Sequence, residues 1–420
     1  MSLHGLALVC GTAVATLALA VPGAGIAQEG ALQERLDAAL ETPVEQGGIP
    51  MAVGGITNAD ETIYSGAFGE RALGSGEPVS VDSVFNMASM TKAITATAAM
   101  QLVEQGKLDL DSPISKWLPD AADLQVLDGV DDSGQPILRA PSREITLRDL
   151  MTHTAGTAYT LWDADLQRYA DAQGGLPALD YDDPATWNQP LMFDPGTRWE
   201  YGTSIDWIGR LVQEVSGQSL GAYMQEHIFD PLGMDSTGYK LTPSMADRRV
   251  ENHLRQDDGS LEVAEWTGQS EPVREYGGGG LYGTMPDYLK FIRMILNDGT
   301  LDGHQILEPE TVAQMSQNQM GDVRVEMLET TNAERSLDAE FFPGLEKSWG
   351  LSFMINEEEA PTGRPAGSLA WAGLYNTFFW IDPANDVGGV FMSQLLPFVD
   401  TEVLQAFHDF ESAYYEASGS

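Results

Sequence analysis

The sequence contains very little cysteine and few basic residues. Its single cysteine, Cys10, lies in the first apolar run, so the remaining chain has no disulfide, no thiol nucleophile and no thiolate metal ligand. Lys and Arg number 22 against 63 Asp and Glu, which gives a formal net charge of −41. Such an acidic chain repels nucleic-acid phosphates and anionic lipid surfaces. We therefore expect neither a nucleic-acid partner nor a peripheral-membrane role.

Histidine is also scarce, and no two histidines are spaced as metal ligands. Beyond the N-terminal segment they stand far apart, at His153, His227, His253, His304 and His408. The sequence therefore predicts no metal site and no cofactor. The length of 420 residues and a hydrophobic fraction of 43% are sufficient for a large globular core. The oligomeric state is left open.

The N-terminal segment predicts export. From Gly5 to Val21 the chain is apolar and rich in small residues, and Gly25-Ile26-Ala27 fits cleavage after Ala27. No Lys or Arg precedes this run, so a buried or anchoring helix is the alternative, although the run is short for a stable span. We expect residues 1–27 to be a signal peptide and residues 28–420 to be periplasmic or secreted, without stable membrane association.

The secondary-structure patterns change from strands to helices and back to strands. Residues 50–57 and 62–68 predict a hairpin, and residues 368–381 and 387–394 predict two further strands. Helical periodicity dominates between them, interrupted by an expected surface loop at 120–143. This order predicts an α/β (α+β) domain whose sheet is built from both chain ends. Its expected sheet-containing part is about 28–85 and 248–420, and its inserted helical part is about 86–247.

The motif Ser89-Met90-Thr91-Lys92 supplies a candidate nucleophile and a candidate base. Three positions apart on a helix, Ser89 and Lys92 share a face, so the lysine nitrogen can reach the serine hydroxyl. A serine hydroxyl becomes a good nucleophile only when a base takes its proton. Apolar residues after Lys92 predict a buried helix that ends at Gly106 and holds the pair rigidly. The S-x-x-K pattern alone is weak, because it also arises by chance.

Longer strings of sequence resemble one known family. The block from Phe85 to Lys92 is similar to the active-site block of serine β-lactamases, penicillin-binding proteins and related esterases. The resemblance continues through Ile145–Gly156 and Pro195–Thr203 and covers about residues 30–400. It implies a β-lactamase-like fold, with an antiparallel sheet flanked by helices.

The resemblance also implies roles for two residues of the second block. Tyr201 stands where the family has its acid/base tyrosine, and a nearby Lys92 would favour its phenolate. Whether Lys92 or Tyr201 is the general base stays open. Thr203 stands where the family has an asparagine that contacts substrate amides, so that contact is in doubt.

The third block, Trp371-Ala372-Gly373, departs from the β-lactamases. They have Lys-Thr-Gly or a close variant here, and the lysine binds the substrate carboxylate. A tryptophan at this position is more similar to the class C β-lactamase-like carboxylesterases. Trp371, Ala372 and Gly373 are thus implied to contact substrate. By the same resemblance, the backbone N–H groups of Ser89 and Leu374 form the oxyanion hole.

Two other residues invite a catalytic interpretation that we do not favour. His153 follows a capping-box pattern formed by Thr146 and Asp149, so a structural place at a helix end is preferred. Ser219 lies in Gly217-Gln218-Ser219-Leu220-Gly221, which fits the G-x-S-x-G nucleophile elbow. That elbow needs a strand before the serine, whereas a helical pattern precedes Ser219.

These observations predict a serine hydrolase that acts on a small-molecule ester. The expected substrates are short-acyl or hydrophobic neutral esters, because the cation that would bind a β-lactam carboxylate is replaced by Trp371. One alternative is a β-lactamase or D-amino-acid peptidase on the same fold. Another is a non-catalytic peptidoglycan-binding sensor, against which the intact Ser89, Lys92 and Tyr201 count.

Overall fold

The computed structural model describes residues 22–131, 135–177, 180, 183–264, 269 and 273–418. Most of the expected signal peptide, residues 1–21, lies outside these residues, so the cleavage site stays a prediction. Helix α1 (Pro22–Glu45) begins earlier than the expected cleavage point and runs past it. In the described part of the chain, no helix is both long and apolar enough to cross a membrane.

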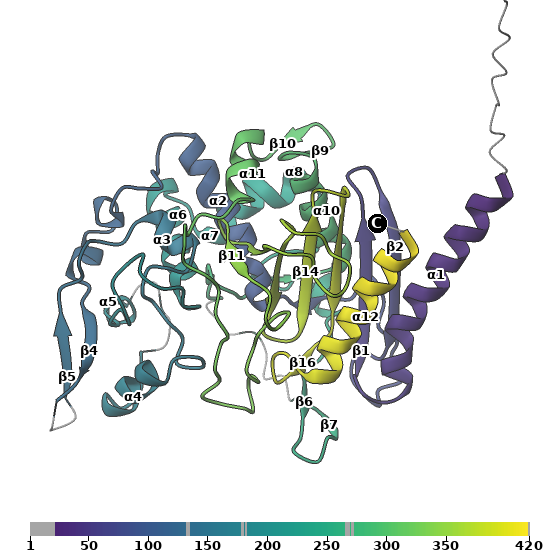
Figure 1. The fold of residues 1–420 in the computed structure, drawn as a ribbon, viewed down its shortest axis with the longest axis horizontal. Helices are drawn as coiled ribbons and strands as arrows, with labels where there is room; N and C mark the ends of the chain where they lie inside the picture. Colours follow the sequence, from purple (N-terminus) through teal and green to yellow (C-terminus); the bar gives the residue numbers. More distant parts are fainter. Residues whose placement is uncertain are drawn as a thin grey trace, which may run out of the picture.

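The central sheet joins strands from both ends of the chain, as the sequence predicts. Its order is β11-β12-β13-β14-β15-β1-β2, and every neighbouring pair is antiparallel. The strands are β1 (Met51–Thr57), β2 (Thr62–Gly69), β11 (Lys347–Trp349), β12 (Met354–Asn356), β13 (Leu369–Gly373), β14 (Thr377–Asp382) and β15 (Val387–Met392). The N-terminal hairpin therefore completes a sheet begun by the C-terminal strands (Figure 1).

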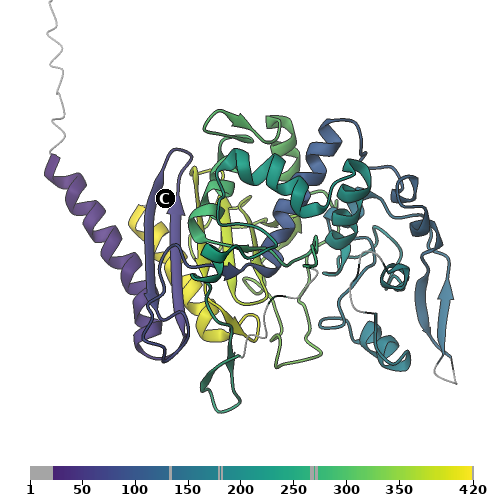
Figure 2. The same cartoon turned by 180° about the vertical axis from the view of Figure 1, so that it is seen from behind.

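Helices cover both faces of this sheet (Figures 1 and 2). Helices α1 and α12 (Thr401–Ser418) pack on one face, and α10 (Met285–Leu296) packs on the other. Two adjacent glycines of β1 permit this close approach. A Cβ on Gly54 would lie 2.8 Å from Phe410 of α12, and a Cβ on Gly55 would lie within the contact distance of Met285 of α10.

A mainly helical region is inserted between β2 and the C-terminal strands. Helix α2 (Thr91–Glu104) is buried along nearly its whole length and packs on α6 (Ser204–Ser216). The other helices are α3 (Leu147–Met151), α4 (Ala164–Ala172), α5 (Pro184–Trp187), α7 (Leu220–Met224), α8 (Asp230–Leu232), α9 (Pro243–Ala246) and α11 (Pro309–Met315). The short strands are β3 (Phe85–Asn86), β4 (Val126–Val130), β5 (Pro136–Arg139), β6 (His253–Arg255), β7 (Leu261–Val263), β8 (Tyr282–Gly283), β9 (Thr300–Leu301), β10 (His304–Gln305) and β16 (Leu395–Leu396).

Two details of the sequence prediction are wrong. The expected loop at 120–143 contains a hairpin, because β4 pairs with β5. The expected single strand at 368–381 is two strands, because the chain turns after Gly373 and pairs back on itself. The second correction places Leu374 in a turn at the end of β13 rather than inside a strand.

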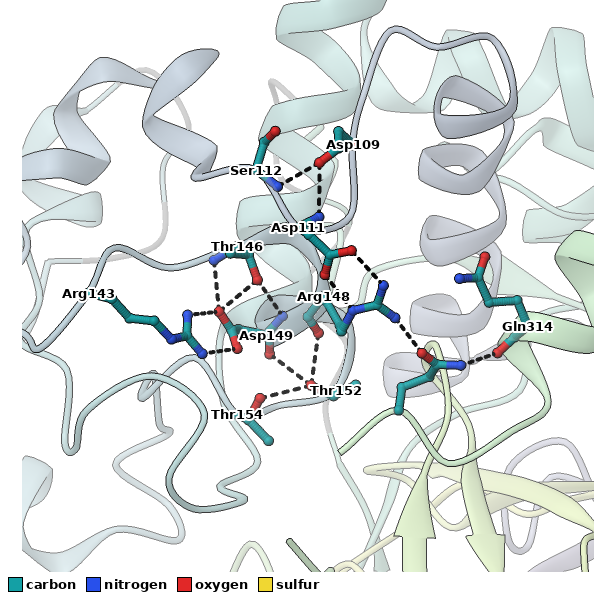
Figure 3. A network of polar contacts seen from close by, with 11 residues as sticks. Asp109, Asp111, Ser112, Arg143, Thr146, Arg148, Asp149, Thr152, Thr154 and Gln314 are labelled. Atoms are coloured by element: carbon teal, nitrogen blue, oxygen red, sulfur yellow. Dashed lines mark hydrogen bonds and ion pairs between the residues drawn. The ribbon is translucent and has the colours of Figure 1, made fainter. Parts of the chain in front are cut away.

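Helix α3 is fixed by an extensive set of polar contacts (Figure 3). Thr146 and Asp149 form the predicted capping box at its N-terminus. The Asp149 carboxylate also accepts two hydrogen bonds from Arg143, at 2.6 and 2.8 Å. Arg148 in turn makes a bidentate pair with Asp111, which precedes α3 in the chain. These contacts hold α3 against the segments that precede it in the chain. The turn from α3 to His153 therefore follows a rigidly held helix.

Candidate active site

The candidate nucleophile lies in a tightly held turn before α2. Ser89 belongs to a 3₁₀ turn (Ala88–Met90) that joins β3 to α2. Ala88 has φ +44°, an unfavourable backbone conformation for a residue with a side chain, and such strain persists only where the surroundings impose it. Met87 and Met90 supply these restraints, since the Met87 N–H bonds the Leu281 carbonyl at 2.9 Å and the Met90 carbonyl accepts from the Tyr288 hydroxyl at 3.0 Å.

The structure brings Lys92 to Ser89, as the motif predicts. The Nζ atom of Lys92 lies 3.1 Å from Oγ of Ser89, 2.6 Å from the Gly278 carbonyl oxygen and 3.3 Å from the Tyr159 hydroxyl. Lys92 is 1% exposed and makes no ion pair with a carboxylate of the described residues. An ammonium group has three N–H donors, so these three oxygen atoms can satisfy all of them.

Tyr201 lies beside Lys92 but is oriented by a different partner. The Lys92 nitrogen lies 4.8 Å from the centre of the Tyr201 ring, over its face. The Tyr201 hydroxyl oxygen accepts a hydrogen bond from the indole N–H of Trp371 at 3.0 Å. Tyr201 is 2% exposed and packs among aromatic rings, including those of Trp162 and His153.

A second tyrosine contacts Lys92, and the sequence analysis does not identify it as a site residue. Tyr159 makes the hydrogen bond with Lys92 given above, and it is held by the buried carboxylate of Asp206. Burial raises the pKa of Tyr159 well above its ordinary value, and the nearby Asp206 and Tyr201 raise it further. Tyr159 therefore keeps its proton at neutral pH.

Asp206 is the other residue that the sequence analysis misses. It is 2% exposed and its Oδ1 atom accepts the Gly278 N–H at 2.8 Å. A Cβ on Gly277 or Gly278 would collide with the first turns of α6, at Ile205 and Asp206. The backbone at Gly277 and Gly278 thus lies close to α6 beneath the active site. Its only sequence signal is the position of Asp206 five residues after Tyr201, in the first turn of a helix.

A cavity of about 550 Å³ opens over Ser89. Its walls include the aromatic and apolar side chains of Tyr159, Leu161, Trp162, Tyr276, Leu374 and Tyr375. Leu374, the second predicted oxyanion donor, therefore shares a cavity with Ser89. This volume is in the range of small-molecule sites.

The other residues predicted to contact substrate are not among those that line this cavity. Trp371 is 4% exposed and packs on Tyr201 and Trp349 rather than lining the cavity. Ala372 is buried in β13, and Gly373 packs against the nucleophile turn, because its Cβ would meet the Met87 carbonyl oxygen. Thr203 precedes α6 and lines a separate, much smaller cavity.

His153 and Ser219 occupy the places expected for them. His153 follows the end of α3 with φ +56°, is fully buried, and packs against Tyr201 in a tilted arrangement with ring centres 4.8 Å apart. Burial and the Lys92 charge lower the pKa of His153 well below its ordinary value, so the ring is neutral. Ser219 caps the N-terminus of α7 and follows helix α6, so no strand leads into it.

Comparison with known proteins agrees with this geometry. The sequence profile of the family described as beta-lactamase matches residues 36–413. The lovastatin esterase of Penicillium rubens is 34% identical over 391 residues, which cover 88% of this chain and 94% of that protein. The solved structure of a simvastatin synthase mutant (LovD9) from Aspergillus terreus is 31% identical, with a TM-score of 0.78 over 91% of this chain and 98% of that one.

One more solved structure shows the same fold at lower identity. EstCE1, a hydrolase with promiscuous acyltransferase activity, is 22% identical, with a TM-score of 0.73 over 93% of this chain and 100% of that one. The predicted resemblance to penicillin-binding-protein-like hydrolases and β-lactamase-related esterases, and the predicted fold, are thereby confirmed.

Proposed function

Because the chain belongs to the β-lactamase family, we propose that it is a serine hydrolase that cleaves carboxylic esters through an acyl-enzyme on Ser89. The observation that carries this proposal is the 3.1 Å separation of the Lys92 Nζ and Ser89 Oγ atoms beside a cavity of about 550 Å³. The lovastatin esterase that this chain resembles supports an ester as the substrate.

The proposed reaction has two acyl-transfer steps. Oγ of Ser89 attacks the ester carbonyl carbon while its proton passes to the pair formed by Lys92 and Tyr201. The backbone N–H groups of Ser89 and Leu374 stabilise the oxyanion. The C–O bond of the ester then breaks, the alcohol leaves with the proton, and water attacks the acyl-enzyme to release the acid and regenerate Ser89.

The surroundings of the two tyrosines support different roles for them. The Tyr201 oxygen accepts a hydrogen bond from the Trp371 N–H, and the Lys92 nitrogen lies over the Tyr201 ring. Tyr159 instead keeps its proton because it is buried beside Asp206. We propose that Tyr201 exchanges the proton with Lys92, and that Tyr159 holds the lysine in position.

The proposed substrates are neutral esters with a short or hydrophobic acyl group. Trp371 stands where β-lactamases have a cation for the substrate carboxylate, and its indole is turned to Tyr201. A charge-assisted hydrogen bond contributes about 1.5–3 kcal/mol, so its loss from β-lactam turnover costs about ten- to a hundredfold in rate. The test is kcat/KM for p-nitrophenyl butyrate and for a chromogenic cephalosporin on one preparation. Equal efficiency would favour the β-lactamase alternative.

Transfer of the acyl group to an alcohol is a second candidate function. The simvastatin synthase and the hydrolase with acyltransferase activity that share this fold favour it. An alcohol that enters the cavity would take the place of water in the second step. Mass spectrometry of the products formed from p-nitrophenyl butyrate in the presence of butanol separates the two outcomes, because transfer yields butyl butyrate and hydrolysis yields butyric acid.

We also propose that the protein is exported and cleaved after Ala27, with the mature chain folding as one hydrolase domain. The apolar run from Gly5 to Val21 and the small residues before the site support this. N-terminal sequencing of the protein recovered from the periplasm or medium should begin at Gln28. Recovery of the intact N-terminus in the membrane fraction would contradict cleavage.

A further inference from the structure

Arg335 is an arginine without a partner at the catalytic cavity. Of the arginines in the part of the chain that the structure describes, it is the one whose guanidinium makes neither a hydrogen bond nor an ion pair. The protein has 63 acidic residues for 22 basic ones, so carboxylates are abundant. An arginine that none of them neutralises, in the wall of the cavity over Ser89, leaves a bidentate anion-binding group available to a ligand.

The backbone around Arg335 is held firmly. The Arg335 N–H bonds the Asn332 carbonyl at 3.1 Å, and the Arg335 carbonyl accepts from the Phe398 N–H at 2.9 Å. The next residue, Ser336, accepts a hydrogen bond from the Trp162 indole N–H at 3.0 Å. The loop therefore holds the Arg335 backbone in a fixed position, and Trp162 and Arg335 both line the cavity.

The charges within the cavity also favour an anion there. Asp206 is the one carboxylate among the residues that line it, and it is occupied by the Gly278 N–H and by Tyr159. Tyr375 lies close enough for the Arg335 charge to oppose the rise that burial causes in the pKa of its phenol. A bound anion would thus meet a cation and no free carboxylate among the lining residues.

We propose that Arg335 binds a carboxylate that the substrate carries away from its scissile bond, so that the preferred substrates are esters with a carboxylate-bearing acyl or alcohol part. This rests on the proposed ester hydrolysis and revises its substrate class. Trp371 offers no cation beside the scissile bond, so the neutral requirement applies there, whereas a carboxylate farther along the substrate is bound by Arg335. Arg335 lies on a different segment from Trp371, so it does not restore the lysine of the β-lactamases. Arg335 is instead a second determinant of substrate specificity, which distinguishes esters that carry a carboxylate from esters that do not.

The test compares an anionic and a neutral ester with the same leaving group. Mono-p-nitrophenyl glutarate and p-nitrophenyl butyrate are hydrolysed by the wild-type chain and by the variants Arg335→Gln, Arg335→Lys and Arg35→Gln. We expect Arg335→Gln to lower the ratio of kcat/KM for glutarate to kcat/KM for butyrate by about tenfold. This is the lower end of the effect of a charge-assisted hydrogen bond, because the site is open to solvent. Arg335→Lys should lose less.

Arg35→Gln is the matched control. It removes the same charge, but Arg35 lies on α1, where it is exposed and paired with Glu416. The ratio should not change in this variant, and an equal fall in both variants would mean that only net charge matters. An unchanged ratio in Arg335→Gln would overturn the proposal.

A binding measurement separates failure of this inference from failure of the proposed function. In the Ser89→Ala background, titration calorimetry with mono-p-nitrophenyl glutarate should show weaker binding when Arg335→Gln is added. This readout requires no turnover, so it holds even if no ester is hydrolysed. Equal affinity in the two proteins would contradict the carboxylate site, whereas absent hydrolysis with a retained Arg335 effect would contradict only the esterase proposal.

Discussion

The indole N–H of Trp371 donates a hydrogen bond to the hydroxyl oxygen of Tyr201 at 3.0 Å, and both side chains are almost fully buried. This hydrogen bond fixes the orientation of the Tyr201 hydroxyl group, whose ring lies beside the Lys92 nitrogen. The tryptophan that replaces the β-lactamase lysine therefore acts on the candidate acid/base group. This makes Trp371 a positioning residue in our account rather than the substrate contact that the sequence suggests.

Replacing Trp371 with Phe tests this relationship. The variant keeps an aromatic ring in the cluster but loses the N–H donor, so we expect kcat for p-nitrophenyl butyrate to fall by about tenfold. KM should stay close to the wild-type value, because Trp371 orients Tyr201 and does not line the cavity. A rise in KM with an unchanged kcat would instead indicate that Trp371 contacts the substrate.

Lys92 and Tyr201 should behave as one proton-transfer unit. We expect Lys92→Ala and Tyr201→Phe each to lower kcat by about 10²-fold or more. The double variant should have the same kcat as the less active of the two single variants. Steady-state kinetics on a p-nitrophenyl ester measures all three. Tyr159→Phe is the comparison, since its hydroxyl stays protonated and its loss should cost less. Additive losses from Lys92 and Tyr201 would mean that the two serve separate steps.

Glu200, next to Tyr201 in the chain, should make stability depend on pH. Burial raises the pKa of Glu200 from 4.5 to about 7. The negative charges of Asp163 and Glu326 add to this rise, and the positive charge of Arg198 opposes it. Between these values the folded state holds a proton that the unfolded state has lost, so the free energy of unfolding falls as pH rises.

The variant Glu200→Gln removes this titration. The free energy of unfolding of the variant minus that of the wild type should therefore increase from pH 4 to pH 8, on the order of 3 kcal/mol. Denaturant unfolding at both pH values measures this difference. Glu214→Gln, at an exposed position of α6, is the control and should follow wild type at both. A constant difference between Glu200→Gln and wild type would contradict the raised pKa.

A buried ion pair connects the C-terminal helix to the loop after β12. Nε of Arg364 lies 3.2 Å from Oε1 of Glu411 on α12, with exposures of 2% and 0%. Arg364→Met should destabilise the protein by about 3–5 kcal/mol, because it leaves Glu411 buried without its partner. The double variant Arg364→Met/Glu411→Leu should recover most of this loss in denaturant unfolding. Additive destabilisation would show that the two side chains are not energetically coupled.

The sequence predicts the architecture well because its main strands are apolar segments bounded by turn residues. Residues 50–57 contain β1, which is buried along its whole length, and residues 62–68 lie in β2, the edge strand beside it. The turn after Gly373 was missed because the apolar residues on both sides of it resemble one continuous strand. Gly373 and Asn376 are turn-favouring residues, and Asn376 has φ +62°. Gly373 also packs closely against the nucleophile segment.

The site is only partly readable from sequence for a similar reason. Ser89 and Lys92 are three residues apart, so local helical geometry brings them together. Tyr159 and Arg335 reach the cavity from loops and Asp206 from the first turn of α6, and tertiary packing rather than a spacing rule brings them together. Their contacts, and the hydrogen bond from Trp371 to Tyr201, are therefore visible only in the folded structure.

Acylation of Ser89 is the most direct test of the account. The wild-type protein should be labelled by a fluorophosphonate probe, with one adduct that intact-mass and peptide mass spectrometry place on Ser89. Ser89→Ala should abolish labelling, while Ser219→Ala, which removes only the cap of α7, should be labelled as wild type is. An adduct on Ser219, or unchanged labelling of Ser89→Ala, would contradict the assignment of Ser89 as the nucleophile.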